Sequence, residues 1–290
     1  MEFSKPIINI IQERISHRTY SGHSLEKDLR EKVLNLLENH DLISPFSKYA
    51  GKARFRLLSI PEFNSKERKK LGTYGFIKGA QDFIVGAVEK SQYSREHYGY
   101  LMETIILGAT DLGLGTCWLG GFFNRSLFAS KINCTSDEII PAITPIGYSA
   151  QRTVREKVIR SFAKADKRLP WDQLFFEGNH NVSLSKEEAG KYSKLLEMVR
   201  LGPSAGNKQP WRIFKEPNRE VFHFYTINPK DGRFLQYSKF RPIDIGIAVS
   251  HFDLTAKELG INGNWILETP QIPGADDLIY KITWNGDTKK

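Results

Sequence analysis

Apolar positions recur along the chain at two periods, and each period predicts a type of element. Residues 24–38 place leucine and valine at helical spacing. Residues 98–113 and 245–260 are apolar on more than one face, which is typical of helices buried between layers, and each pattern ends at a glycine suited to a C-cap. Shorter apolar runs between turn residues predict strands at 53–60, 82–90, 142–149, 211–215, 221–227 and 278–284. This mixture predicts an α+β fold.

The same layout occurs twice along the chain. The segment SLEKDLREKVLNLLE (24–38) aligns without gaps on SLSKEEAGKYSKLLE (183–197), and LGATDLGLGTCW (107–118) aligns on LTAKELGINGNW (254–265). Two matches in the same order, displaced by about half the chain, predict an internal duplication. We expect two related α/β halves, residues 1–165 and 166–290, packed as a pseudo-twofold dimer within one chain. Residues 163–181 are expected to connect them without regular structure.

Composition narrows the class of protein further. The 290 residues are 40% hydrophobic and 26% charged, with a formal charge of +9, as in a globular chain with a solvated surface. Basic residues are spread from end to end with no nucleic-acid-binding motif, so we expect no nucleic-acid partner. We find neither a signal peptide nor an apolar run long enough for a membrane span, and we expect a cytoplasmic protein with no membrane partner.

Metal and disulfide chemistry are not expected. The two cysteines, Cys117 and Cys134, do not make a disulfide framework, and no Cys or His pair stands near them at zinc-ligand spacing. The seven histidines are scattered and contain no H-E-x-x-H pattern. We therefore expect no protein-bound metal.

The segment GPSAGNKQPW (202–211) contains the G-x-S-x-G pattern of a hydrolase nucleophile elbow, and Asp244 and His251 follow in the order of that class. An elbow places its serine between a strand and a following helix, whereas here the pattern predicts a helix before Ser204 and a strand after it. Serine hydrolysis is therefore a remote alternative. The remaining interpretations are a ligand-binding loop, with Ser204 and Asn207 as hydrogen-bonding groups, and a plain turn that ends the helix.

Three ordered motifs resemble those of the FMN-dependent nitroreductases. GPSAGNKQPW resembles their P-S-x-x-N-x-Q-P-W loop, RISHRTY (14–20) resembles their N-terminal R-x-S-x-R/K-x-F, and GLGTCWLGGF (113–122) resembles their G-L-G-x-x-W-x-G-G-F. PIGYS and KADKRLPWDQL extend the match over nearly the whole chain. The resemblance implies the nitroreductase-like α+β fold. Because the loop motif occurs only in the second half, the chain resembles the single-chain, tandem branch of the family.

The resemblance also implies a set of cofactor-binding residues for FMN. Arg14, Ser16, Arg18, Lys167 and Arg168 are implied at the phosphate, where arginine offers a bidentate fork. The backbone of Gly120 and Gly121 is implied near flavin N5 and O4, where glycine permits close approach. Further implied contacts are Tyr74 and Gly75 and, from the partner-like half, Pro203, Ser204 and Asn207.

The repeat indicates that one of the two symmetric sites has decayed. Arg14, Ser16 and Arg18 align on Gln173, Phe175 and Glu177, so the second half has no cations at the phosphate positions. The first half has SPFSKYAGK (44–52) where the P-S-x-x-N loop would stand. We expect one FMN per chain.

The activity implied by the resemblance is an NAD(P)H-dependent FMN oxidoreductase that passes reducing equivalents to a small acceptor, such as an aromatic nitro compound or a quinone. The flavin carries the chemistry, so no catalytic side chain is assigned. An FMN-binding redox sensor or flavin store without turnover has the same sequence features and stays open as an alternative. We expect a monomer that contains an internal pseudo-dimer.

Overall fold

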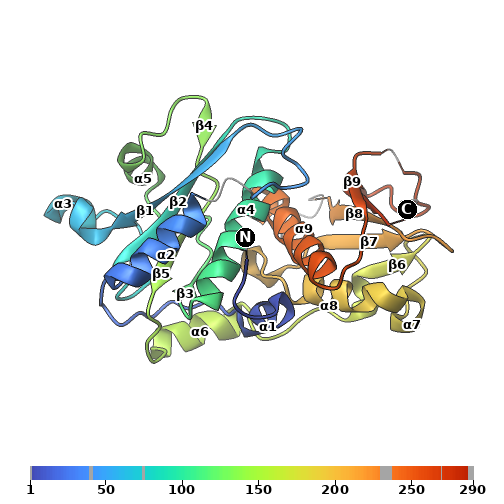
Figure 1. The fold of residues 1–290 in the computed structure, drawn as a ribbon, viewed down its shortest axis with the longest axis horizontal. Coiled ribbons are helices and arrows are strands. Elements are labelled where there is room, and N and C mark those ends of the chain that lie inside the picture. The colour runs from blue at the N-terminus through green and yellow to red at the C-terminus, as the bar shows by residue number, and fades with distance from the viewer. Residues whose placement is uncertain (1, 39–41, 74–75, 229–236, 269, 287–290) are drawn as a thin grey trace. The chain divides into compact units, whose positions relative to one another are not determined.

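The computed structural model describes residues 2–38, 42–73, 76–228, 237–268 and 270–286. The chain divides into two compact units, Met1–Ala165 and Asp166–Lys290 (Figure 1). Both units combine helices with a mainly antiparallel sheet, as the α+β prediction requires. Within the described residues, every helix is too short or too polar to cross a bilayer.

The first unit is built on one antiparallel sheet. Its strands are ordered β1-β2-β5-β3, and β4 pairs with β2. Its elements are α1 (Ile7–Glu13), α2 (Lys27–Leu37), β1 (Ala53–Ser59), η1 (Ile60–Glu62), α3 (Ser65–Arg68), β2 (Asp82–Glu89), α4 (Ser94–Asp111), β3 (Gly115–Thr116), α5 (Arg125–Lys131), β4 (Glu138–Ile139), β5 (Ile143–Gly147) and α6 (Val154–Phe162).

Both faces of this sheet are covered. Helices α2 and α4 pack on one face, where the Phe55 ring of β1 contacts the Tyr98 ring of α4 (Figure 1). On the other face Phe128 of α5, fully buried, meets the rings of Phe63, Phe83 and Phe123 edge-on. Because both faces are apolar, β2 is buried over seven successive residues and lacks the alternation of a half-exposed strand.

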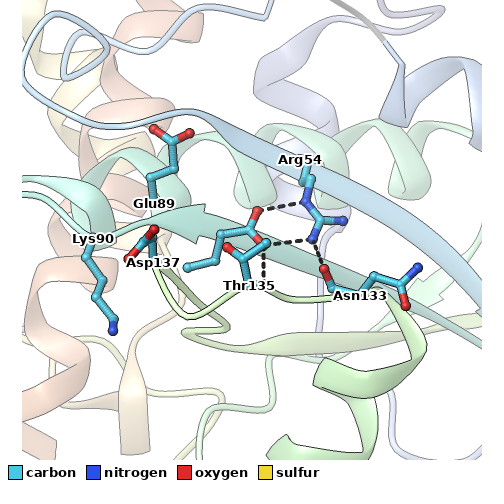
Figure 2. Close-up of a pocket in the computed structure, with 7 residues that line it drawn as sticks. Arg54, Glu89, Lys90, Asn133, Thr135 and Asp137 are labelled. Carbon is cyan, nitrogen blue, oxygen red and sulfur yellow. Dashed lines mark hydrogen bonds and ion pairs between the residues drawn. The ribbon is translucent and has the colours of Figure 1, made fainter.

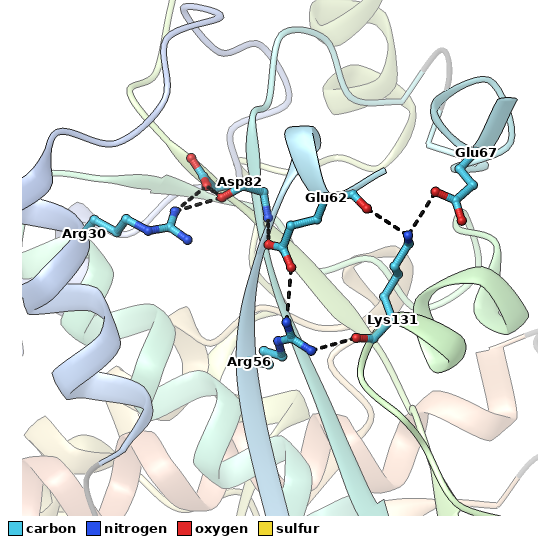
Figure 3. Close-up of polar contacts among 7 residues, drawn as sticks. Arg30, Arg56, Glu62, Glu67, Asp82 and Lys131 are labelled. Carbon is cyan, nitrogen blue, oxygen red and sulfur yellow. Dashed lines mark hydrogen bonds and ion pairs between the residues drawn. The ribbon is translucent and has the colours of Figure 1, made fainter. Parts of the chain in front are cut away.

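Polar contacts close the end of the β1–β2 hairpin (Figure 3). Arg30 of α2 donates to Ser59 at 2.8 Å and to the buried Asp82 carboxylate at 3.0 Å. Lys131 of α5 donates to the Glu62 carbonyl at 2.8 Å and pairs with Glu67 at 2.9 Å. These bonds attach α2 to the ends of β1 and β2, and α5 to η1 and α3, which follow β1.

The second unit has a five-stranded sheet in the order β6-β7-β8-β10-β9. Only the β6–β7 pair is parallel. Its elements are η2 (Trp171–Gln173), β6 (Phe175–Glu177), α7 (Lys186–Ala189), η3 (Gly190–Tyr192), α8 (Ser193–Leu201), η4 (Ala205–Asn207), β7 (Trp211–Lys215), β8 (Val221–Ile227), α9 (Arg241–Glu258), β9 (Asn264–Ile266) and β10 (Leu278–Asn285).

The two faces of the second sheet are covered differently. Helix α9, which packs against α8, covers one face, where Phe252 contacts the rings of Phe222 and Phe224 (Figure 1). The opposite face carries Phe214 and Tyr225, which pack on residues of the irregular stretch between β9 and β10. That stretch takes the place of a second helical layer.

The two units share one order of strands. β1-β2-β5-β3 in the first unit matches β7-β8-β10-β9 in the second, and a long buried helix follows the first hairpin in each. In each unit a tryptophan indole donates to a carboxylate of that helix: Trp118 to Glu103 at 2.7 Å, and Trp265 to Asp253 at 2.8 Å. The predicted glycine C-caps also hold, since Gly113 and Gly260 have φ of 76° and 64°.

The connecting region differs from the expected loop. Residues 175–177 form β6, which pairs with β7, and α6 ends at Phe162 immediately before the region. Helix α6 does not show the usual pattern of buried apolar and exposed polar residues. Glu156 and Arg160 are buried, while Val154 and Phe162 are 78% and 86% exposed. Burial of charged groups at one helix face indicates a polar site beneath it.

Candidate functional site

The segment after α1 runs as an extended chain beside β3. Ser16 bridges to Thr116, and the His17 N–H donates to the Thr116 carbonyl at 2.8 Å. In an extended chain alternate side chains share a face, so the R-x-S-x-R spacing places Arg14, Ser16 and Arg18 together. Burial raises the pKa of the Cys117 thiol, which follows β3, against opposing effects of Arg18, Arg14 and Ser16, so all three side chains lie near this thiol. The structure thus brings together the three predicted phosphate ligands of the first unit.

Helix α6 and the residue two positions before it add two cations that the sequence motifs do not indicate. Arg160 Nη1 donates to the Ser16 carbonyl at 3.3 Å, and Arg152 Nε lies 3.9 Å from Glu156. The Glu156 carboxylate accepts from the Arg18 backbone N–H at 3.3 Å and the Thr19 hydroxyl at 2.7 Å. The signal in the sequence is the i, i+4 spacing of Glu156 and Arg160, which places both on one helical face.

Positive charge is in excess around Ser16. Counted by themselves, four guanidinium groups (Arg14, Arg18, Arg152, Arg160) and two carboxylates (Glu103, Glu156) carry a formal charge of +2. His17 does not add to this excess at neutral pH, because burial lowers the pKa of its imidazole against the opposing effect of Glu156. A dianionic group would balance the cluster.

Two guanidinium atoms also lack a hydrogen-bond partner. Within the described residues, Arg14 Nε and Arg18 Nη1 are buried and make no hydrogen bond, although Arg14 Nε lies 3.7 Å from Glu103. A buried donor without a partner costs about 1–3 kcal/mol, so such groups are retained mostly where a ligand uses them. Unpartnered N–H groups, excess positive charge and a nearby hydroxyl together fit the phosphate of FMN, which carries nearly two negative charges.

The glycine pair lies in a turn after β3. Leu119, just before it, exchanges backbone hydrogen bonds of 2.9 Å with Ile143, and the Gly120 carbonyl accepts from Arg125 Nη2 at 3.0 Å. Gly121 is exposed and Gly120 half-buried, so backbone groups of this turn are accessible to a ligand. Nearby Cys117 is 2% exposed, and burial raises the pKa of its thiol, so it is a protonated core residue and not a nucleophile.

Glu103 joins these two parts of the first unit. It lies fully buried on α4, accepts from the Trp118 indole at 2.7 Å and pairs with Arg14 Nε at 3.7 Å. One carboxylate therefore fixes the phosphate-side arginine and the tryptophan two residues before the glycine pair. Tyr74 and Gly75, also expected at the cofactor, lie outside the described residues.

In the second unit, the predicted loop is folded tightly on itself. Ser204 Oγ accepts from the Gln209 N–H at 2.8 Å, and the Ala205 N–H donates to Asp244 Oδ1 at 3.0 Å. Asn207 and Gln209 adopt φ of 56° and 47°, a left-handed conformation that is unfavourable for residues other than glycine. Such strain persists where surrounding bonds fix it, and it concentrates at ligand sites.

The loop also contacts the second basic motif. Asn207 Nδ2 donates to the Lys167 carbonyl at 2.9 Å, and Arg168 Nη1 lies 3.4 Å from Asn207 Oδ1. Arg168 further donates twice to the Leu201 carbonyl, at 3.0 and 3.2 Å. The structure therefore places Lys167 and Arg168 beside Pro203, Ser204 and Asn207, with the Arg168 guanidinium engaged in holding the loop.

The hydrolase alternative finds no support in the partners of its three residues. Ser204 and Asp244 bond to the backbone N–H groups of Gln209 and Ala205, and His251 Nδ1 bonds to the Met198 carbonyl at 2.8 Å. His251 is fully buried on α9, and burial raises the pKa of Asp244 well above its usual value. The triad order in the sequence is coincidental.

A separate polar cavity of about 690 Å³ opens at the β1, β2 and β4 edge of the first unit (Figure 2). Three of its charged groups, Arg54, Glu138 and Lys90, are hydrogen-bonded to neighbours. Arg54 donates to Glu138 at 2.7 and 2.8 Å, which lowers the pKa of that carboxyl to about 2, and Lys90 donates to the Ser136 carbonyl at 2.6 Å. It contains none of the predicted cofactor residues, and we do not assign it a ligand.

Comparisons with known proteins bear on this site. The family model described as "Putative TM nitroreductase" matches residues 6–256. A nitroreductase-type structure from Thermotoga maritima aligns with a TM-score of 0.60 at 20% identity, over 99% of this chain and 97% of that chain. No curated protein matches the chain.

Two shorter structures align with lower scores. A nitroreductase family protein from Clostridium difficile 630 aligns with a TM-score of 0.42 at 19% identity, over 59% of this chain and 94% of its own. A nitroreductase with bound FMN from Desulfitobacterium hafniense aligns with a TM-score of 0.41 at 16% identity, over 51% of this chain and 92% of its own. The Thermotoga match shows the fold, and because the family model covers most of the sequence, the chain belongs to the nitroreductase family that this model describes.

Proposed function

We propose that the protein is an FMN-dependent oxidoreductase of the nitroreductase type, which takes reducing equivalents from NAD(P)H and passes them to an aromatic nitro compound, a quinone or a similar small acceptor. The observation that carries the proposal is the arginine cluster of the first unit, with two unpartnered guanidinium atoms beside Ser16. Membership of the nitroreductase family, together with the resemblance of the motifs to those of FMN-dependent nitroreductases, supports FMN as this dianion.

Arg14, Ser16 and Arg18 hold the phosphate in this proposal, and Arg160 fixes the backbone at Ser16. Backbone groups of Gly120 and Gly121 stand near the reactive edge of the ring, where glycine permits close approach. Ser204 and Asn207 stay predicted contacts from the second unit. When bound, FMN supplies the two-electron redox chemistry.

In this proposal the side chains of the protein bind and orient the cofactor, and none of them transfers a proton. Cys117 is protonated and buried, and His17 is neutral at pH 7 because burial lowers its pKa. Glu103 keeps Arg14 and Trp118 in place, which preserves the shape of the site before a ligand arrives. Donor N–H groups fixed in advance would stabilise negative charge that develops on a bound acceptor or ring.

The visible absorption spectrum of the purified protein, with flavin stoichiometry, tests the cofactor. We expect a flavin spectrum with one FMN per chain. A colourless protein without FMN affinity would overturn the proposal, and two FMN per chain would contradict the loss of the second site.

Anaerobic stopped-flow mixing with NADH or NADPH separates a reductase from a redox sensor or flavin store. Bleaching of the flavin absorbance, followed by reoxidation with a nitroaromatic or quinone acceptor, is the result expected for a reductase. No bleaching with either nicotinamide would favour the sensor or store.

A further inference from the structure

A histidine and two glutamates meet on the face of the second sheet away from α9. His223 lies in β8, which pairs with β7 on one side and with β10 on the other. Its neighbours Phe222 and Phe224 contact Phe252 of α9, so the alternation of a strand directs His223 to the opposite face. That face is covered by the irregular stretch between β9 and β10, which contains Glu268.

The three side chains come from separate segments. Glu216 follows β7, His223 belongs to β8, and Glu268 follows β9. One ligand atom from each, the imidazole nitrogen and two carboxylate oxygens, lies within 4.8 Å of the other two. Ligand atoms about 2.0–2.2 Å from a common ion are roughly 3–3.5 Å apart, so a small rotation of a partly exposed glutamate completes the geometry.

The imidazole ring is held from its far side. His223 Nδ1 lies 2.8 Å from Thr283 Oγ1, which lies 2.8 Å from the Tyr280 hydroxyl. Tyr280 in turn accepts from the Glu268 backbone N–H at 3.0 Å. Such a second layer of hydrogen bonds is typical of histidines that bind metals, because it fixes the ring and the tautomer that directs Nε2 to the ion.

The charges in the cluster favour a cation. The His223 ring is 1% exposed, and the partly exposed Glu216 and Glu268 bring two carboxylates to it. Glu216 already pairs with Arg219 through its Oε2 atom at 2.5 Å, while its Oε1 atom faces His223 Nε2 at 2.9 Å. Within the described residues, the Glu268 carboxylate has no hydrogen-bond or ion-pair partner of its own.

We propose that Glu216, His223 and Glu268 form a binding site for one divalent transition-metal ion. One nitrogen and two oxygen ligands suit zinc and similar ions, whereas magnesium and calcium prefer oxygen alone. Three protein ligands leave a coordination position for water. The ion joins the irregular stretch to the sheet that it covers, a role that is independent of the flavin.

Zinc titration of the full chain, treated with EDTA and carrying Cys134→Ser, tests the site. The serine replaces the half-buried cysteine of the first unit, whose thiol would otherwise compete for zinc. Glu268→Gln and Glu216→Gln each remove one ligand with little change of shape. Glu187→Gln, an exposed glutamate of α7 in the same unit, is the matched control. Isothermal calorimetry measures stoichiometry and affinity, and thermal denaturation with and without zinc measures stabilisation.

We expect one zinc per chain, at least about tenfold weaker binding in each ligand variant and unchanged binding in the control. Zinc raises the melting temperature of the parent and control proteins but not of Glu268→Gln, and magnesium at the same concentration has no effect. Arg219→Gln tightens binding, because it removes a cation that competes for Glu216. The proposal is overturned if the parent binds no stoichiometric zinc, or if Glu268→Gln binds it as tightly as the parent does.

Discussion

Replacing Arg18 with methionine separates a ligand-binding role from a structural one. In the flavin-free protein, Arg18 Nη1 is buried without a hydrogen-bond partner in the described part of the chain, and it adds to an excess of positive charge. Methionine keeps much of the apolar stem and removes the guanidinium. The unfolding free energy of the flavin-free protein is therefore expected to stay the same or rise by up to about 1 kcal/mol.

FMN binding is expected to change in the opposite direction. A hydrogen bond between charged groups contributes about 1.5–3 kcal/mol, so its loss weakens FMN binding by about 10- to 150-fold. Quenching of FMN fluorescence measures affinity, and urea denaturation of the flavin-free protein measures stability. Arg155→Met, on the exposed side of α6, is the matched control, with stability within about 0.5 kcal/mol of the parent and unchanged affinity.

The reasoning is refuted by one specific pattern. If Arg18→Met loses more than about 1 kcal/mol of stability without flavin while its FMN affinity stays within about twofold, the guanidinium serves the fold and not the ligand.

Three further predictions test the loop, a buried histidine and the core. Ser204→Ala weakens FMN binding by about 2- to 12-fold, because it removes a hydroxyl that also accepts from Gln209; Ser126→Ala, an exposed change, leaves the fluorescence titration unaltered. Burial lowers the pKa of His97 to about 4, so its contribution to the unfolding free energy is fully present above about pH 6.5. We expect the unfolding free energy to fall by about 2–3 kcal/mol as the pH drops from 7.5 to 4.5. Urea denaturation of the parent at each pH measures this loss, and His97→Gln abolishes it. Phe128→Ala lowers the unfolding free energy by about 3–5 kcal/mol, and a loss below about 1 kcal/mol contradicts the packing described for this ring.

Much of the fold was predictable because it depends on local pattern. The buried helices α4 and α9 and the hairpin strands carry long apolar runs, and their positive-φ glycines mark the helix ends. Helix α6 was missed because its charged face is the buried one, and β6 was missed because its three residues lie in a segment with breaking signals on either side. In both cases the secondary structure depends on contacts with residues that are distant in the sequence.

In the candidate site, too, some residues were predictable from local spacing and others depend on the tertiary structure. The R-x-S-x-R spacing predicts three phosphate ligands on one face, since alternate residues of an extended chain share a face. Arg160, about 140 residues later, joins them only through a bond to the Ser16 carbonyl. Arg168, which the resemblance implies at the phosphate, donates to the Leu201 carbonyl at the end of α8, and its phosphate role stays a prediction.

The sequence by itself determined the α+β class, the repeated order of elements and the motif residues of the first unit, because apolar periodicity and short spacing act over neighbouring residues. Only the tertiary structure decided which charges remain unpaired. Burial and partner choice depend on groups brought together from distant segments, as at Arg18 beneath α6, or at His223 between Glu216 and Glu268. These long-range contacts carry both proposals, the phosphate site at Arg18 and the metal site at His223.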